Sequence, residues 1–379
     1  MPEFTRSPVG AESSNGPEPS TGAAVSTAAE RPWGVGAATG VGSMPGTDPD
    51  EAMRVVVGEL EAFPHLVELP ASGIGADMIG RGAAHLLELH TELTVSGWRF
   101  AAHAGADERR SRAALARDLD VLEEHVQGFA GPLKIQCAGP WSIASSVELR
   151  YGDKALADAG AVRDIAAALA EGLAAVAADV QRRVPGAHIV VQVDEPSLPA
   201  VLAGRVRTAS GFGALAAVEF SDAVEKLRRV AAAVSAVGAT PIAHCCADGV
   251  PVGLFVDAGM HAIGLDATLL DDNGSRTDDE IGAAIEHGVA FFLGLIASTD
   301  PDPAEKPVRA QEIAAPARRL WSRLGFAPEN LARDVIVTPT CGLAHASHSW
   351  PARAYRSCTE VARVLLEEPE EARSEKENR

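Results

Sequence analysis

Short apolar runs alternate along the chain with segments in which apolar residues recur at helical spacing. The runs are nearly continuous stretches of aliphatic residues, which is typical of parallel strands buried on both faces. From Trp33 onward they predict strands at Ala38–Val41, His65–Leu69, Leu133–Cys137, Ile189–Val193, Thr240–Ala243, Ala262–Leu265, Val289–Leu295 and Val335–Thr338.

The intervening segments predict helices, because their apolar residues fall on one helical face. The clearest faces are those of Leu115, Leu119, Leu122 and Val126, of Ile165, Leu169, Leu173, Val176 and Val180, and of Val224, Leu227, Val230 and Val234. Further helices are expected over Asp48–Glu61, Asp278–Glu286, Ala310–Leu324 and Ala352–Leu366. Residues 86–102, with a turn at Ser96-Gly97, are expected to form a β-hairpin inserted after the second strand.

Repeated strand–helix units indicate an α/β fold. Eight units over about 335 residues fit a (β/α)8 TIM barrel with loop insertions. A doubly wound open sheet is the alternative, but no Gly-x-Gly-x-x-Gly motif follows the first strand. We expect the barrel to span residues 33–367, between a disordered N-terminal segment, 1–32, and a charged C-terminal tail, 368–379. The N-terminal segment is rich in Ser, Gly, Pro, Glu and Ala, and cannot bury enough apolar surface to offset its ordering entropy.

The amino-acid composition argues against some classes of binding partner and cellular location. The 379 residues carry a formal net charge of -19, and an acidic surface repels phosphate backbones, which argues against nucleic-acid binding. No apolar run approaches the ~20 residues of a membrane-spanning helix, and residues 1–32 contain no apolar core of a signal peptide. Five cysteines, an odd number in a chain without an export signal, favour the reducing cytoplasm.

Metal-type residues follow two of the predicted strands. His244 and Cys246 end one strand, and Cys341 follows another. The carboxyl ends of barrel strands meet on one rim, so these residues predict a His/Cys/Cys zinc site with one further position. Alternation along an extended chain turns Cys245 away from it. The other residues that follow strands are Gly42-Ser43, Glu68, Gly139-Pro140, Asp194-Glu195, Asp266 and Ser298.

Acidic residues on the same rim offer further roles. Asp266 ends the strand after the one that carries His244, and is our candidate for the oxygen ligand, with Glu195 and Asp248 as alternatives. Asp194 and Glu195 are adjacent and point to different sides, so they do not form a general acid/base pair. One of them, facing the rim, would hold a cationic group such as an amine.

Together these residues resemble the C-terminal barrel of cobalamin-independent methionine synthase, from roughly Gly36 to Leu366. The motifs that carry the resemblance are Val41-Gly42-Ser43-Met44-Pro45, Asp77-Met78, Ala138-Gly139-Pro140-Trp141-Ser142, Gln192-Val193-Asp194-Glu195-Pro196, His244-Cys245-Cys246 and Thr340-Cys341-Gly342-Leu343. In length the chain is closer to the short core forms of the superfamily, which includes methylcobamide:thiol methyltransferases and uroporphyrinogen decarboxylase.

The resemblance implies a zinc-dependent methyltransferase that converts homocysteine to methionine. It implies that His244, Cys246 and Cys341 bind zinc, and Asp266 falls near the family's glutamate ligand. It also implies that Val41, Gly42, Ser43 and Asp194 hold the amino-acid end of homocysteine.

Three positions depart from the family's pattern. Gly80 replaces a glutamate, Ser146 falls where a tryptophan supports folate, and Ala297 falls where the family has a catalytic histidine. These departures favour a methylcorrinoid over methyltetrahydrofolate as methyl donor. His345 and His348, in the loop after the last strand, are the remaining candidates for proton delivery. The alternative function is a non-catalytic or regulatory zinc barrel; a decarboxylase would leave the three metal-type ligands without a role.

Overall fold

The computed structural model describes residues 31–270, 276–304 and 306–367, which lie in the compact unit Arg31–Arg379. The expected tail 368–379 lies outside the described residues, as does the expected disordered segment 1–32 except for its last two residues. Of these, Arg31 pairs with the buried carboxylate of Asp334 at 2.5 Å.

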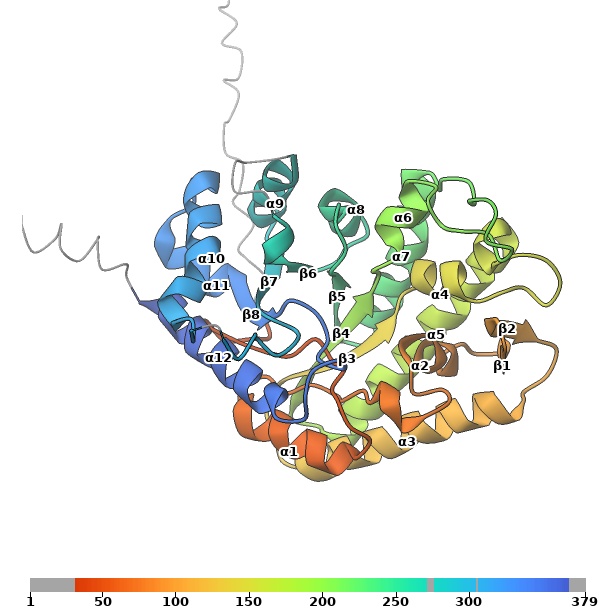
Figure 1. Cartoon of the computed structure of the whole chain (residues 1–379), viewed down its shortest axis with the longest axis horizontal. Helices are drawn as coiled ribbons and strands as arrows, with labels where there is room; N and C mark the ends of the chain where they lie inside the picture. The colour runs from red at the N-terminus through yellow and green to blue at the C-terminus, as the bar shows by residue number, and fades with distance from the viewer. Residues whose placement is uncertain (1–30, 271–275, 305, 368–379) are drawn as a thin grey trace, which may run out of the picture. The chain divides into compact units, whose positions relative to one another are not determined.

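A six-stranded parallel sheet forms the centre of the fold, in the order β3-β4-β5-β6-β7-β8. The sheet is curled, and helices lie around its outside (Figure 1). The strands confirm six of the predicted runs: β3 Gly131–Ala138, β4 Ala187–Asp194, β5 Thr240–Cys245, β6 Ala262–Asp266, β7 Ala290–Ile296 and β8 Val335–Pro339.

The first two predicted strands, Ala38–Val41 and His65–Leu69, are not strands of this sheet. They contribute isolated parallel bridges: Ala38 with Val337 of β8, Ser43 with Glu68, and His65 with Lys134 of β3. Backbone hydrogen bonds such as Thr39 N to Val337 O (3.1 Å) and Leu66 N to Lys134 O (2.8 Å) accompany them.

Side chains occupy backbone groups that a regular ladder would use in these two segments. The Val41 carbonyl accepts hydrogen bonds from Lys134 Nζ at 2.8 Å and from Gln192 Nε2 at 3.0 Å. The Leu66 carbonyl accepts one from Gln136 Nε2 at 2.8 Å. The prediction of eight regular strands was therefore wrong for these two runs, because buried polar side chains interrupt their ladders.

The helices confirm the periodic segments to within a few residues at each end. Shorter helices were not predicted, because fewer than two turns show no clear period of 3.6 residues. The α-helices are α1 Pro49–Glu59, α2 Met78–Ala84, α3 Ala106–His125, α4 Pro140–Ser146, α5 Ala159–Arg183, α6 Leu198–Leu202, α7 Phe220–Ala236, α8 Val252–Asp257, α9 Arg276–Glu286, α10 Ala310–Leu324, α11 Leu331–Asp334 and α12 Trp350–Leu366. The 3-10 turns among the described residues are η1 Pro70–Ser72, η2 Ala155–Ala157, η3 Ala267–Leu269 and η4 Pro328–Asn330. Within the described part of the chain, no helix has the length and apolarity needed to cross a membrane.

The predicted hairpin is confirmed as β1, His90–Thr94, paired antiparallel with β2, Gly97–Ala101. The backbone of Glu148 bonds to Trp98 O and to Phe100 N, both at 2.9 Å, which ties the hairpin to the loop after α4. Trp98 Nε1 also reaches the carboxylate of Asp77, at 3.2 Å. The insertion is thus fixed to the main body at two places.

The interior of the curled sheet is apolar at one end. Trp33 lies 5.2 Å from Phe292 of β7 and 6.1 Å from Phe63 between ring centroids. These rings belong to a cluster that includes residues near the starts of strands: Val190, Ile242, Ala262, Ala290 and Ile336. Because the strand starts are filled by apolar side chains, the polar interior lies toward the strand ends.

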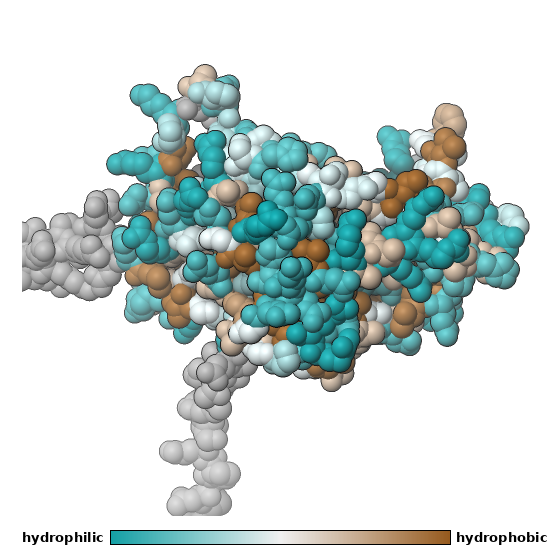
Figure 2. Space-filling model, turned by 90° about the horizontal axis from the view of Figure 1, so that it is seen from below, coloured by the Kyte–Doolittle hydropathy of each residue, from teal (hydrophilic) through white to brown (hydrophobic). Residues whose placement is uncertain are grey.

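The surface is mainly hydrophilic on the face formed by α1 and α3, with hydrophobic residues scattered over it (Figure 2). This agrees with the formal net charge of -19.

Candidate functional site

The three predicted metal ligands converge at the strand ends. The ligand atoms of His244, Cys246 and Cys341 all lie within 4.8 Å of one another, and the two Sγ atoms are 2.9 Å apart. His244 pairs in register with Gly264 of β6, where a Cβ atom would lie only 2.8 Å from His244 Nδ1. The absence of a side chain at position 264 therefore leaves room for the imidazole.

The two thiols are joined by a hydrogen bond. A hydrogen bond from Cys246 stabilises the Cys341 thiolate and lowers its pKa, with a further contribution from His244. The same hydrogen bond and burial raise the pKa of Cys246. His244 is 6% exposed, and its Nε2 atom has no hydrogen-bond partner among the described residues. Two sulfurs and an unpartnered imidazole nitrogen form a donor set that suits zinc.

Cys245 and Asp266 lie apart from these three ligands. Cys245 packs in the hydrophobic core, where burial raises its pKa to about 12. Asp266 ends β6 as predicted, but its Oδ1 accepts hydrogen bonds from Thr268 N (2.9 Å) and Thr268 Oγ1 (2.6 Å). It thereby caps η3. The alternative acid Asp248 is exposed.

The turn Val41–Ser43 lies beside Cys341. Leu343 N donates to Ser43 O at 2.8 Å, and a Cβ atom on Gly342 would lie 2.0 Å from Ser43 Oγ. Gly42 has a φ of 148°, and a Cβ there would lie 2.7 Å from the Gln136 side chain. Neither Gly42 N nor Ser43 N donates a hydrogen bond to any residue in the described ranges. The turn thus offers two consecutive N–H groups next to a predicted metal ligand.

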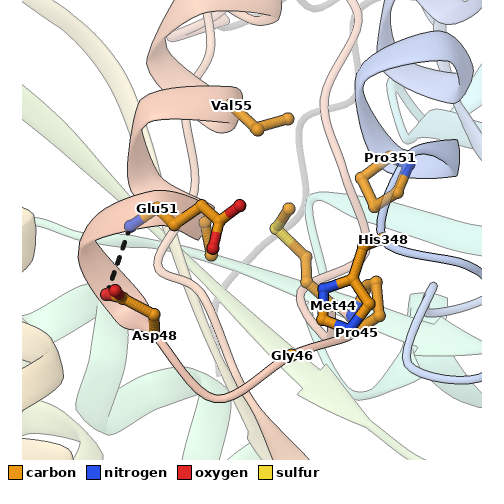
Figure 3. A pocket seen from close by; sticks show the side chains of 9 residues that line it. Met44, Pro45, Gly46, Asp48, Glu51, Val55, His348 and Pro351 are labelled. Carbon is orange, nitrogen blue, oxygen red and sulfur yellow. Dashed lines mark hydrogen bonds between the residues drawn. The ribbon is translucent and has the colours of Figure 1, made fainter.

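A shallow pocket lies next to this turn, between the starts of α1 and α12 (Figure 3). His348 lines it and faces Gly46, where a Cβ would lie 3.1 Å from His348 Cε1. His345 is exposed on the same loop. The remaining lining residues are Met44, Pro45, Asp48, Glu51, Ala52, Val55 and Pro351. Of the two candidate histidines, His348 is the one that lines this pocket, and both are exposed.

Asp194 ends β4 and is 8% exposed. Its Oδ1 accepts a hydrogen bond from Gln192 Nε2 at 2.7 Å. Burial raises the pKa of Asp194 to about 7, and the charge of Glu68 adds to the rise, while His244 and Lys134 oppose it. Glu68 is 7% exposed, so two buried carboxylates influence each other here. The position of Glu68 near the end of the second predicted strand was its only signal in the sequence.

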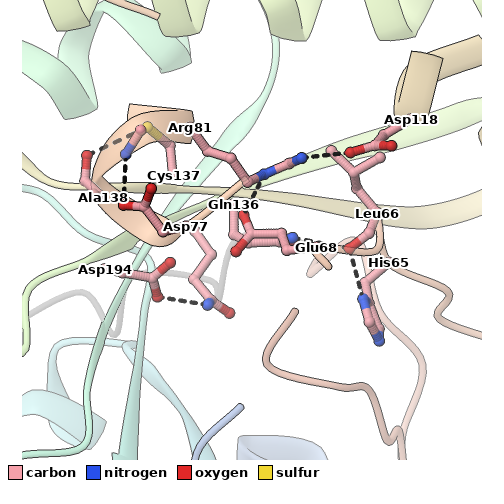
Figure 4. Close-up of polar contacts among 12 residues, drawn as sticks. His65, Leu66, Glu68, Asp77, Arg81, Asp118, Gln136, Cys137, Ala138 and Asp194 are labelled. Atoms are coloured by element: carbon pink, nitrogen blue, oxygen red, sulfur yellow. Dashed lines mark hydrogen bonds and ion pairs between the residues drawn. The ribbon is translucent and has the colours of Figure 1, made fainter. Parts of the chain in front are cut away.

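Two buried cations accompany these acids. Lys134 Nζ donates to Val41 O and to Gln136 Oε1 (3.2 Å), and burial lowers its pKa to about 8. Arg81 reaches from α2 toward Asp118, with Nη1 2.5 Å from Asp118 Oδ2 (Figure 4). Sequence reasoning missed both cations. The signal for Lys134 was a lysine inside a strand predicted to be buried.

Glu195 serves the fold. It is fully buried and accepts hydrogen bonds from Trp141 N (2.9 Å), Ser142 N (2.7 Å) and Ser142 Oγ (2.7 Å) at the start of α4. Burial raises the pKa of Glu195 to about 8. Of the two adjacent acids, Asp194 is the one that pairs in register with the predicted metal ligand His244.

Of the three departures from the family's pattern, Gly80 has a local explanation in the packing. A Cβ on Gly80 would lie 2.7 Å from the Trp98 ring, so the hairpin fills the space that a larger residue would need. Ser146 ends α4, half-buried. Ala297 follows β7, and its carbonyl accepts a hydrogen bond from Trp350 Nε1 at 3.0 Å.

Solved structures support the fold. A B12-independent methionine synthase from Shewanella sp. W3-18-1, in complex with selenomethionine, aligns at 12% identity with a TM-score of 0.56. The alignment covers 90% of this chain and 100% of that one. A methylaspartate ammonia lyase from Clostridium tetanomorphum aligns over 90% of this chain and 61% of its own, at 13% identity, but its TM-score of 0.40 is too low to indicate a shared fold.

Sequence comparison identifies the family. No curated protein matches the chain. A sequence profile described as "Cobalamin-independent synthase, Catalytic domain" matches residues 133–364, which is more than half of the chain and includes most of β3 and the other five strands of the sheet. The chain therefore belongs to the family of cobalamin-independent synthase catalytic domains, and it is a methionine synthase-like methyltransferase.

Proposed function

We propose that the protein transfers a methyl group from methyltetrahydrofolate to the thiol of homocysteine, giving methionine, with zinc held by His244, Cys246 and Cys341. The observation that carries the proposal is the convergence of these three ligands, with His244 Nε2 buried and unpartnered among the described residues. Zinc bound there would supply the deprotonation of the substrate thiol at neutral pH.

Asp266 is the proposed oxygen ligand, but its carboxylate already accepts two hydrogen bonds. Its carboxylate would exchange at least one of its two hydrogen bonds to Thr268 for the metal. A charged acceptor bound to both a backbone N–H and a hydroxyl does not move without cost. We therefore expect Asp266 to bind more weakly than the two cysteines.

The amino-acid end of the substrate fits the groups beside the metal ligands. Asp194 would hold the ammonium group, with Glu68 adding negative charge close by. The free N–H groups of Gly42 and Ser43 would hold the carboxylate, as consecutive N–H groups do in anion-binding turns. Val41 would supply the carbonyl that anchors this turn.

A methylcorrinoid donor is not supported, because the family's chemistry is independent of cobalamin. With methyltetrahydrofolate, the methyl group leaves a tertiary amine nitrogen, which is a poor leaving group unless it is protonated. We propose His348 as the proton donor, because it faces the turn that precedes α1. His345 is the second candidate on that loop.

We also propose that the segments around Ala38 and His65 complete a (β/α)8 barrel. The support is the bridges that link them to β8, to each other and to β3. A cytoplasmic location agrees with the need for reduced ligand thiols, since metal binding requires thiolates.

The alternative is a non-catalytic zinc barrel, favoured by the altered positions Gly80 and Ala297. Elemental analysis, calorimetric titration with homocysteine and a methionine-forming assay with methyltetrahydrofolate separate the two. Zinc and homocysteine binding with turnover supports the enzyme. Binding of both without turnover supports the alternative, and failure to bind homocysteine refutes the proposed function.

A further inference from the structure

A lysine lies at the centre of the polar interior, among the groups just described. Lys134 is fully buried on β3, and shares a face of the strand with Gln136, because alternate residues of a strand point the same way. Burying an ammonium group is unfavourable unless its surroundings compensate for the lost water. The contacts of Lys134 show what compensates it.

Lys134 and a residue of the neighbouring strand β4 both donate hydrogen bonds to the carbonyl of Val41. Lys134 Nζ donates to Val41 O at 2.8 Å, and Gln192 Nε2 of β4 donates to the same oxygen at 3.0 Å. A carbonyl oxygen has two lone pairs, so both acceptor positions of Val41 O are used. The orientation of the Val41–Gly42 peptide is therefore fixed by side chains of the sheet.

This orientation determines where the next N–H group points. In a planar trans peptide, the carbonyl and the following N–H point in opposite directions. Because the Val41 carbonyl faces Lys134, the Gly42 N–H faces away from the buried lysine. Gly42 N donates to no other residue that the structure describes, so it is available to a ligand.

The charge of Lys134 acts on the same site. The carboxylates of Asp194 and Glu68 both interact with its ammonium group. Gln192 joins the two effects, since its Nε2 donates to Asp194 Oδ1 as well as to Val41 O. Lys134 thus affects both the Gly42 N–H, which is proposed to bind the substrate's carboxylate, and Asp194, which is proposed to bind its ammonium group.

We infer that Lys134 is a positioning residue for the amino-acid end of the substrate. It fixes the Val41–Gly42 peptide so that the Gly42 N–H meets the substrate carboxylate, and it offsets the charge of Asp194 and Glu68 while the site is empty of substrate. The inference rests on the proposed function, and it adds a residue that does not touch the substrate.

The test compares two thiols on one variant. Lys134→Met keeps the length of the side chain and removes its charge and donors. Homocysteine carries the amino-acid end and 1-propanethiol does not. By calorimetric titration of the full chain, we expect Lys134→Met to bind homocysteine at least 10-fold more weakly, and 1-propanethiol within 2-fold of the wild type, at unchanged zinc content. Lys226→Met, which removes a lysine of α7 paired with Glu225, is the matched control and should change neither affinity.

Three results would overturn the assignment. Equal losses for both thiols would make Lys134 a general support of the fold, and unchanged homocysteine binding would deny it any positioning role. A wild-type protein that binds 1-propanethiol but not homocysteine would refute the proposed substrate and the inference with it. If Lys134→Met does not fold, as judged by circular dichroism, Lys134→Gln replaces it, with the same selective loss expected.

Discussion

Replacing Asp194 by asparagine should stabilise the free protein and weaken its binding of homocysteine. Asparagine keeps Oδ1, which accepts the hydrogen bond from Gln192 Nε2 at 2.7 Å, and removes only the charge. Burial first, and the charge of Glu68 in addition, raise the pKa of Asp194 from 3.8 to about 7. The ionised carboxylate is thus less stable in the folded chain than in the unfolded one.

The size and pH window of the effect follow from these two pKa values. Well below pH 4 the carboxyl is protonated in both states and does not affect stability. As the pH rises through the window from about 4 to 7, the unfolded chain loses the proton first, so the folded state loses stability. A difference of about 3 between the pKa values corresponds to about 4 kcal/mol at pH 8. Asp194→Asn should recover much of this at pH 8 and almost none at pH 4.

Binding should change in the opposite direction. A charge-assisted hydrogen bond to the substrate's ammonium group contributes about 1.5–3 kcal/mol, or roughly 10- to 150-fold in affinity. The assays are urea unfolding at pH 4 and pH 8 with a chelator present, and calorimetric titration of the zinc-loaded protein. Asp158→Asn is the control, because Asp158 is an exposed cap of α5 and asparagine caps equally well.

An equal change in stability at both pH values would show that the charge of Asp194 is not the cause. A homocysteine affinity equal to that of the wild type would show that Asp194 does not hold the ammonium group. Either result refutes the reasoning.

The remaining predictions concern the metal, the proton donor and the hairpin. Cys246→Ser and Cys341→Ser should each lose most of their zinc by elemental analysis, while Cys245→Ser retains it; full occupancy in either of the first two would contradict the ligand assignment. His348→Ala should slow methionine formation from methyltetrahydrofolate by about 10²- to 10⁴-fold at unchanged homocysteine affinity; an undiminished rate would exclude this proton donor. Gly80→Ala should lower the free energy of unfolding by about 1–3 kcal/mol, because the added methyl group overlaps a neighbouring indole and backbone; unchanged urea unfolding would contradict the packing.

The sequence predicts best those elements that have a regular hydrophobic pattern. Six strands and the longer helices follow from the hydrophobic pattern, because each element carries that pattern in its own residues. The grouping of His244, Cys246 and Cys341 follows from a rule of topology, since parallel strands end on the same rim. No contact between distant residues had to be known for either prediction.

What the sequence does not predict depends on such contacts. Ala38–Val41 has the composition of a strand, yet its Val41 carbonyl accepts hydrogen bonds from side chains of β3 and β4. The positions of those side chains depend on the tertiary structure. Likewise, nothing near Gly80 in the chain shows that Trp98 fills the space beside it. Lys134 could be seen as unusual in a strand predicted to be buried, but its hydrogen-bond partner, the Val41 carbonyl, lies 93 residues away.

The turn at Val41 serves two purposes at once, and this limits how the protein can change. Its carbonyl ties the first segment to β3 and β4, and its free N–H groups lie where the substrate is proposed to bind. A substitution that adjusts one role disturbs the other. New substrate preferences should therefore arise more readily in the loops beyond the strands, such as the one that carries His348, than in this turn. Directed evolution of the protein would do best to randomise those loops and leave residues 41–43 untouched.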